Sequence, residues 1–352
     1  MEKGSVGEMK SIVKELAWAS YSWAWKEVGG VLERLCEGRN EVTLDVDGYE
    51  LQLTQVDSVY WPGEDGRKPV TKRDYLRYLV EVYPFLIKHL RQRPITLTRY
   101  SQGINGVWSF HRHWEGELPP FVETVNIYTE HSRLDRSHLL CNNLATLLWL
   151  GEVATLELRP WFSRVEAQPD GGGLPHIFSG SAWQVSHSVL NYPDFMIFDL
   201  DPYFCSLGTF DDREADRVAF RKCREVAFRL KEILESLSLT PYVKTSGRGG
   251  GLHIYVPILR NMDYPHVRSA AAAIAWLMIE EYPQDVTTEW LVAKSAGKLL
   301  LDYNQNLRGK TLPSVYSPIA DRGGLVSIPV RWEELDVLDP AEFTMEAARD
   351  RL

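Results

Sequence analysis

The chain has 352 residues, of which 44% are hydrophobic, 25% charged and 11% aromatic. This composition is typical of folded globular proteins and excludes fibrous or disordered ones. The formal net charge of −9 excludes attraction to nucleic acid by total charge, so a polyanion would need local basic patches or bound cations. The longest apolar runs are too short to span a bilayer and the N-terminus lacks a signal-peptide pattern, which predicts a cytoplasmic protein without membrane contact.

The first half of the chain predicts helices and strands in mixed order. Apolar residues at helical spacing indicate an N-terminal helical extension over residues 1–40. Asp47 and Gly48 lie between two alternating segments and predict a hairpin at the start of a single catalytic domain over 41–345. Further along, the patterns predict a helix capped by Thr71, a strand over 95–100, a helix over 136–152 and a strand over 155–161.

The second half alternates strands and helices more regularly. Residues 164–193 are rich in Gly, Ser, Asn and Pro and predict a long surface loop joining two halves, 41–163 and 194–345. Strands are expected over 195–201, 241–245, 252–258 and 298–303, with helices over 212–237 and 264–281. This order predicts an α/β or α+β fold whose sheets pack under helices.

The most informative chemical signal is the carboxylate pair Asp199 and Asp201 at the end of an apolar strand. Two residues apart on a strand, both side chains project from the same face and repel each other unless a cation lies between them. Asp302 ends another apolar strand and would complete an all-oxygen site for two divalent ions. The alternative for each is a solvated strand end or turn.

A glycine-rich turn in KTSGRGGGLHIYVP, residues 244–257, is a second candidate site. Glycines let backbone N–H groups approach an anion, and Ser246, Arg248 and His253 can add donors. The spacing matches neither a Walker A loop nor a dinucleotide fingerprint. A purely structural glycine hairpin is the alternative.

Basic and aromatic residues are mixed in the N-terminal half, at Lys72 and Arg99 and then in WSFHRHW, residues 108–114, which contains Phe110 and Arg112. Such a mixture can hold phosphates while stacking exposed bases. The alternative is a solvated helix face beside a core aromatic cluster.

Taken together and in order, these stretches resemble the polymerase domain of bacterial ATP-dependent DNA ligase D, of the archaeo-eukaryotic primase superfamily. The resemblance runs over about residues 43–340 and is carried by LTQVDSVYWP, TKRDYL, RPITLTRY, ATLLWLGEVATLELRPW, FDLDP, VKTSGRGGGLHIYVP, LLLDYNQNLRGKT and IPVRWEEL. It implies an α+β primase-polymerase core, with antiparallel and mixed sheets flanked by helices.

The resemblance also implies roles for individual residues. Asp199, Asp201 and Asp302 match catalytic carboxylates that bind two Mn²⁺ or Mg²⁺ ions. Ser246, His253 and Gln305 match contacts to the incoming nucleotide, to which we add the cationic Arg159, Arg248 and Lys298. On the DNA side, Lys72 matches a lysine that binds a 5′-phosphate at a gap and Phe110 an aromatic that stacks on the template, and we add Arg99 and Arg112.

Several positions depart from the family pattern. Ser109 replaces the first aromatic of the stacking pair, and Arg159 replaces a histidine. Ser295 and Ile319 stand where arginines are expected, and the phosphate pocket has Gln55, Ser58 and Thr98 in place of an asparagine and two basic residues. These departures predict weaker binding of the 5′-phosphate and altered contacts to the triphosphate.

The implied function is template-dependent primer extension with NTPs or dNTPs, including ribonucleotide incorporation, during gap filling or non-homologous end joining. The implied partners are DNA with ends or short gaps, Ku, and a separate DNA ligase, because the K-x-D-G ligase motif is missing from the sequence. Two alternatives stay open. One is a primase that starts strands de novo, and the other is a DNA-end-binding module with weakened catalysis.

Overall fold

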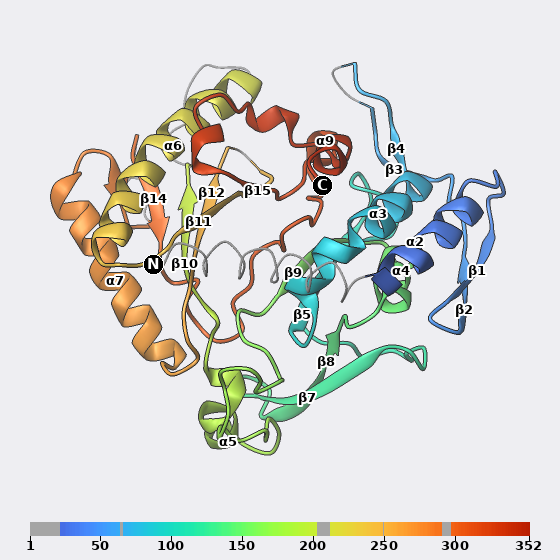
Figure 1. Ribbon diagram of the computed structural model, residues 1–352, viewed down its shortest axis with the longest axis horizontal. Helices are drawn as coiled ribbons and strands as arrows, with labels where there is room; N and C mark the ends of the chain where they lie inside the picture. Colours follow the sequence, from blue (N-terminus) through green and yellow to red (C-terminus); the bar gives the residue numbers. More distant parts are fainter. Residues whose placement is uncertain (1–21, 64–65, 203–211, 249, 291–296) are drawn as a thin grey trace, which may run out of the picture.

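The computed structural model describes residues 22–63, 66–202, 212–248, 250–290 and 297–352 (Figure 1). Of the predicted N-terminal extension, residues 1–21 lie outside this part. The helix α2 (Ser22–Leu35) buries Val28, Val31 and Leu35 in the main apolar core. This portion of the extension is therefore packed into the domain.

Local sequence rules explain the next elements. β1 (Val42–Val46) and β2 (Tyr49–Leu53) form an antiparallel hairpin whose turn residues Asp47 and Gly48 have φ of 56° and 78°, as a type I′ turn requires. The helix α3 (Lys72–Leu90) begins with a capping box, in which the Thr71 hydroxyl accepts from the Asp74 N–H and the Asp74 carboxylate accepts from the Thr71 N–H. Both predictions are confirmed.

An antiparallel sheet forms the centre of the N-terminal half. β5 (Pro94–Tyr100) pairs with β6 (Trp108–His111), β8 (Leu134–Leu140) and β9 (Thr155–Pro160), and β8 pairs with β7 (Glu123–Thr129). β3 (Val59–Trp61) and β4 (Val70–Thr71) form a separate pair. The predicted helix over 136–152 is wrong in its first part, because 134–140 pair with β7 and α4 (Leu144–Glu152) begins only after the cap Asn143.

The connection between the halves contains a short helix, α5 (Ala182–His187), and a 3₁₀ turn over Val189–Asn191. One fully buried side chain, Arg260, fixes its first part. The Arg260 guanidinium lies 2.8 Å from the Asp170 carboxylate and 3.4 Å from that of Asp194. It also donates to the carbonyls of Glu166 and Ala167. Arg260 thus attaches the first part of the connection to the C-terminal half, and Arg308 attaches its end through the Asn191 side chain.

The C-terminal half contains a second sheet, with strand order β13-β14-β10-β12-β11-β15 among the described residues. Neighbours are antiparallel except β13 and β14. The strands of this sheet are β10 (Phe195–Asp201), β11 (Tyr242–Thr245), β12 (Leu252–Pro257), β13 (Val286–Thr287), β14 (Leu299–Asp302) and β15 (Pro329–Val330). The helices in this part of the chain are α6 (Asp212–Ser236), α7 (Tyr264–Glu281) and α9 (Met345–Asp350). Short 3₁₀ turns cover Arg322–Gly324, Trp332–Glu334 and Pro340–Glu342.

The two faces of this sheet have different partners. α6 and α7 pack on one face (Figure 1), where Phe198 and Leu200 are fully buried. Because side chains alternate along a strand, Asp199 and Asp201 project from the opposite face. The chain from 311 to 320 joins that side to β9, since the Ser314 N–H donates to the Leu158 carbonyl. No helix in the described residues has the length and apolar character needed to cross a membrane.

Candidate active site

Asp199 and Asp302 face each other across two neighbouring strands. β10 and β14 place Asp199 directly opposite Asp302, a position in which side chains on one face of the sheet are neighbours. The Asp302 side chain is buried and that of Asp199 is 17% exposed. Asp201 follows on the same face of β10. The structure therefore gathers the three predicted carboxylates at one end of these strands.

The amide of Gln305 lies between two of these carboxylates. Its Nε2 is 2.9 Å from Asp302 Oδ2 and 3.4 Å from Asp199 Oδ2, so a partial positive charge already occupies the space between them. An all-oxygen donor set of this kind fits Mg²⁺ or Mn²⁺. Within the described residues, no group of three or more His, Cys, Asp or Glu side chains is arranged to hold a metal ion. Further ligands would come from side-chain rotation, water or substrate.

The Asp199 carboxyl has a strongly raised pKa. Burial, together with the charges of Asp201 and Asp302, raises its pKa from 3.8 to about 8, against the opposing charges of Lys244 and Arg159. Without a cation, the Asp199 carboxyl is therefore protonated at neutral pH. Binding of a divalent ion would displace this proton, because a ligating carboxylate is ionised.

The perturbed Asp199 predicts a pH dependence of stability for the metal-free protein. The folded protein keeps a proton that the unfolded chain releases, so the free energy of unfolding should fall as pH rises from 3.8 to about 8. Asp199→Asn stays neutral and lacks this decline. We expect the variant to be more stable by about 1–3 kcal/mol at pH 8 and nearly unchanged at pH 4. Urea unfolding in EDTA measures the difference, and parallel pH profiles would contradict the raised pKa.

His253 on β12 is the second neighbour of Asp199. It is the register partner of Asp199, and its Nε2 lies 3.4 Å from Asp199 Oδ1. Its Nδ1 lies 2.7 Å from the Lys244 ammonium, which also donates to the Ser327 hydroxyl. Burial, reinforced by Lys244, holds the pKa of His253 well below its usual range. A neutral ring can therefore accept from Lys244 and donate to Asp199. Sequence reasoning missed Lys244, whose only signal is a charge at a buried strand position.

The glycine-rich turn is compact because its glycines make close contacts. Gly250 has φ of 72°, and a side chain there would meet the Asp216 carbonyl at 2.7 Å. The Ser246 hydroxyl donates to the Arg248 carbonyl at 2.6 Å and accepts from the Arg248 N–H at 3.2 Å. These contacts are compatible both with a structural turn and with an anion site.

Arg159 and Arg248 come from the two halves of the chain and meet on one buried carboxylate. Glu157 Oε2 is 3.0 Å from Arg159 and Oε1 is 3.1 Å from Arg248. Arg248 also lies 3.4 Å from the Asp321 carboxylate, so two carboxylates balance the two guanidinium groups. The charge of Arg159 acts to lower the pKa of Asp199, against the larger effect of burial. Sequence reasoning missed Glu157, although its alternation with Arg159 on one strand was a usable signal.

Ile319 occupies a position where the family resemblance suggests an arginine. It is buried, and it packs so closely on Gly247 that an added Cβ there would meet Ile319 Cγ1 at 2.4 Å. Its carbonyl accepts from the Trp61 indole at 3.1 Å. The residue therefore contributes packing and brings no charge to the turn. Ser295, the other departure of this kind, lies outside the described residues.

Lys72 lies in a cavity of about 360 Å³ that also contains Gln55, Ser58 and Arg99. Its ammonium is already paired, at 2.8 Å from Glu152 and 2.9 Å from the Thr54 carbonyl. The cavity therefore contains a carboxylate next to the lysine expected to bind phosphate. Glu152 was missed because the sequence gives no sign that it meets Lys72.

The remaining predicted residues lie outside the cluster of carboxylates. Phe110 on β6 is 47% exposed, and the Arg112 guanidinium is 5.9 Å from its ring centroid. Arg99 donates to the Val153 carbonyl and lies over the Trp114 ring. Lys298 donates to the Pro283 carbonyl. Among these four, the structure brings Phe110, Arg112 and Arg99 to one shallow hollow on the surface.

Comparison with known proteins identifies the family to which the chain is similar. The family model described as LigD, primase-polymerase domain, matches residues 71–352. The chain is 28% identical over 305 residues to the bifunctional non-homologous end joining protein LigD of Bacillus subtilis (strain 168), covering 86% of this chain and 42% of the relative. A multifunctional LigD of Pseudomonas aeruginosa is 28% identical over 269 residues, covering 76% and 28%. The chain spans less than half the length of these relatives.

A solved structure agrees with this assignment. The polymerase domain from Mycobacterium tuberculosis ligase D in complex with DNA aligns with a TM-score of 0.70 at 24% identity, covering 86% of this chain and 93% of that one. The fold is thus the α+β primase-polymerase fold that the sequence predicted. Since the family model also matches most of the sequence, the chain belongs to the family of LigD primase-polymerase domains.

Proposed function

We propose that the protein is a nucleotidyltransferase that extends a DNA or RNA primer on a template, at DNA ends and short gaps, during end-joining repair. The observation that carries this proposal is the placement of Asp199 opposite Asp302, with His253 on the other side of Asp199. Family membership supports it, as does the DNA bound to the matched polymerase domain. Ku and a separate DNA ligase are proposed partners.

The catalytic proposal assigns the carboxylates to two Mn²⁺ or Mg²⁺ ions. When bound, such ions activate the primer 3′-hydroxyl and stabilise the charge of the leaving pyrophosphate. Asp199, Asp201 and Asp302 would hold them, and the contact from His253 would keep the Asp199 carboxylate oriented. Gln305 would turn its amide from the carboxylates to the incoming nucleotide.

The nucleotide contacts follow from the positive charges around the carboxylates. Arg159 and Arg248 both contact Glu157, and Arg248 also contacts Asp321, so these ion pairs orient two guanidinium groups that would exchange a carboxylate for the triphosphate. Ser246 can rotate its hydroxyl from the Arg248 backbone to a phosphate oxygen. We also retain Lys298 as a peripheral contact that would first leave the Pro283 carbonyl.

The proposed DNA surface is the hollow beside β6. The exposed Phe110 ring offers a stacking face for a template base, and Arg112 and Arg99 offer charges for the backbone. Ser109, in place of a second aromatic, has its hydroxyl 2.8 Å from the His111 ring. Stacking would therefore rest on Phe110 and on Trp108, which is 61% exposed.

Recognition of a downstream 5′-phosphate is expected to be weak, because Glu152 neutralises Lys72. We predict that wild-type protein binds gapped DNA with and without a 5′-phosphate with affinities within about threefold, and that Glu152→Gln increases the preference for phosphate by about fivefold to tenfold. Fluorescence anisotropy at fixed salt measures both affinities. Glu50→Gln, at an exposed position on β2, is the matched control. A tenfold preference in the wild type, or no change in Glu152→Gln, would contradict the pairing argument.

Primer extension on gapped DNA tests the proposed function. We expect Mn²⁺-dependent addition of ribo- or deoxynucleotides that follows the template sequence and stops in EDTA. Dinucleotide synthesis on an unprimed template would favour the primase alternative. Binding of DNA ends with no incorporation at any Mn²⁺ or Mg²⁺ concentration would favour the binding module and overturn the proposal.

A further inference from the structure

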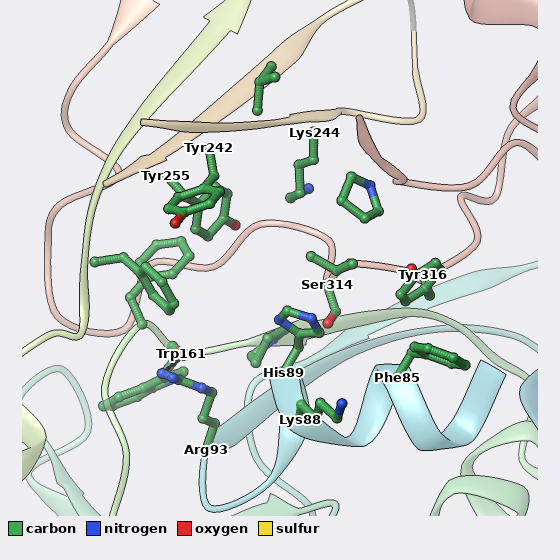
Figure 2. Close-up of a pocket in the computed structure, with 16 residues that line it drawn as sticks. Phe85, Lys88, His89, Arg93, Trp161, Tyr242, Lys244, Tyr255, Ser314 and Tyr316 are labelled. Carbon is green, nitrogen blue, oxygen red and sulfur yellow. Dashed lines mark hydrogen bonds between the residues drawn. The ribbon is translucent and has the colours of Figure 1, made fainter. Parts of the chain in front are cut away.

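A cavity of about 390 Å³ lies between the C-terminal part of α3 and the strands β11 and β12 (Figure 2). Its volume is in the range of sites that bind small molecules. Tyr255 and Lys244 line it, and both project from the sheet face that carries Asp199. None of Asp199, Asp201 and Asp302 is among its lining residues. The cavity is therefore separate from the candidate active site, although Lys244 touches both.

Aromatic rings form a large part of the walls of this cavity. Figure 2 shows side chains from the sheet and from α3 pointing into one shared space. The Tyr255 ring packs edge-to-face against the Phe195 and Phe162 rings, with centroids 5.4 and 6.1 Å apart. Such contacts hold the rings in fixed orientations, which favours a planar aromatic ligand over a flexible aliphatic one. The Phe, Trp and Tyr lining residues are Phe85, Trp161, Phe162, Phe195, Tyr242, Tyr255 and Tyr316.

The polar part of the lining is basic, and no Asp or Glu is among the lining residues. Arg93 is neutralised by a buried ion pair with Asp194. Burial, aided by nearby basic side chains, lowers the pKa of His89 to about 4, so this ring is neutral at pH 7. The other basic lining residues are Lys88 on α3, whose ammonium lies 5.8 Å from the Phe85 ring centroid, and Lys244 on β11, whose pKa is lowered by burial to about 7. A basic lining without carboxylates favours an anion over a cation, and the partly titrated Lys244 favours one negative charge over several.

Ser314 provides an independent indication of a ligand. Its side chain is almost fully buried at 3% exposure, it lines the cavity, and its hydroxyl has no hydrogen-bond partner among the described residues. A buried hydroxyl without a partner is destabilising by about 1–3 kcal/mol. In the view of Figure 2, Ser314 lies between Lys244 on the sheet and Lys88 on α3. A ligand oxygen at this place would satisfy the hydroxyl and meet the positive charges.

We propose that this cavity binds a planar aromatic monoanion, such as a two-ring aromatic carboxylate or sulfonate, with its rings against the aromatic walls. The anionic group points to Ser314 and the two lysines. Because the ligand would contact Lys244, whose ammonium contacts His253, its binding would alter the surroundings of Asp199. The binding proposal itself stands on the cavity alone and does not depend on the proposed polymerase activity.

Titration with 8-anilinonaphthalene-1-sulfonate, followed by its fluorescence, tests the site. We expect saturable binding of one dye per folded chain. Ser314→Ala should weaken the affinity about fivefold, by loss of one hydrogen bond. Lys88→Glu, at an exposed position, should weaken it about threefold to tenfold. Lys68→Glu makes the same charge change at an exposed position outside the lining and should leave the affinity unchanged.

Two comparisons make the test specific. Neutral N-phenyl-1-naphthylamine should bind wild type and Lys88→Glu with equal affinity, because it lacks the anionic group. Nucleoside triphosphate with Mn²⁺ should not displace the sulfonate dye. Equal dye affinity in wild type, Ser314→Ala and Lys88→Glu would overturn the proposal, as would full displacement by the triphosphate, which would place the dye at the carboxylates. Melting temperatures verify that the variants fold.

Discussion

Asp199→Asn is expected to reduce nucleotide incorporation by at least about 1,000-fold while leaving the fold intact. The substitution keeps the size of the side chain but removes the charge that would hold a cation opposite Asp302, and charge stabilisation of this kind supplies several kcal/mol in phosphoryl transfer. Single-turnover primer extension with saturating Mn²⁺ measures the rate. Asp302→Asn should behave similarly, because the two carboxylates are register partners.

The control for this prediction is Asp45→Asn. Asp45 lies on β1 with its side chain exposed, away from the carboxylate cluster, so its substitution makes the same chemical change without touching the candidate site. Incorporation by Asp45→Asn should equal that of the wild type. If Asp199→Asn incorporated nucleotides at the wild-type rate, Asp199 would not be a catalytic residue. Unaltered circular dichroism of both variants verifies that a lost rate reflects chemistry.

Arg260→Ala is expected to lower the free energy of unfolding by about 3–5 kcal/mol. The Arg260 side chain is fully buried and contacts the carboxylates of Asp170 and Asp194 and several backbone carbonyls. Asp170 would keep its contact with Arg164, and Asp194 those with Arg93 and Arg164. The carbonyls of Glu166 and Ala167 would lose the Arg260 donor, at about 1–3 kcal/mol each, and the side chain would leave a cavity. Urea unfolding at pH 7 measures the loss.

Two further variants distinguish the loss of the Arg260 contacts from a general effect of removing an arginine. Arg260→Lys keeps the positive charge, but an ammonium group cannot reach all the carboxylates and carbonyls that the planar guanidinium contacts. We therefore expect a loss of stability smaller than that of Arg260→Ala. Arg221→Ala removes an exposed arginine from α6 and should change the free energy of unfolding by less than about 0.5 kcal/mol. A loss below 1 kcal/mol in Arg260→Ala would mean that other contacts fix the connection.

Prediction from sequence succeeded where a local rule decides the structure. The Asp47–Gly48 turn follows from residues that tolerate positive φ, and the start of α3 follows from the Thr71–Asp74 capping box. The helix α7 occupies the expected range, 264–281. The end of β10 places Asp199 and Asp201 on one face because side chains alternate along a strand.

Prediction failed where distant segments decide the structure. Residues 136–140 were expected to begin a helix, yet each of them pairs with β7. The mostly apolar segment 139–150, which Asn142 and Asn143 interrupt, fits a buried strand end followed by a helix as well as it fits one helix, so periodicity could not separate them. Backbone hydrogen bonds to another strand resolved the ambiguity.

For the candidate site, the sequence by itself determined the residue types, their order and the faces they share. Only the tertiary structure decided their partners. It set Asp302 opposite Asp199, and it placed a buried Lys244 behind His253. It also paired Lys72 with Glu152, which converts a predicted phosphate site into a neutral one. These outcomes depend on burial and on charges brought together by folding, because electrostatic interactions are governed by distance in space and not by separation along the chain.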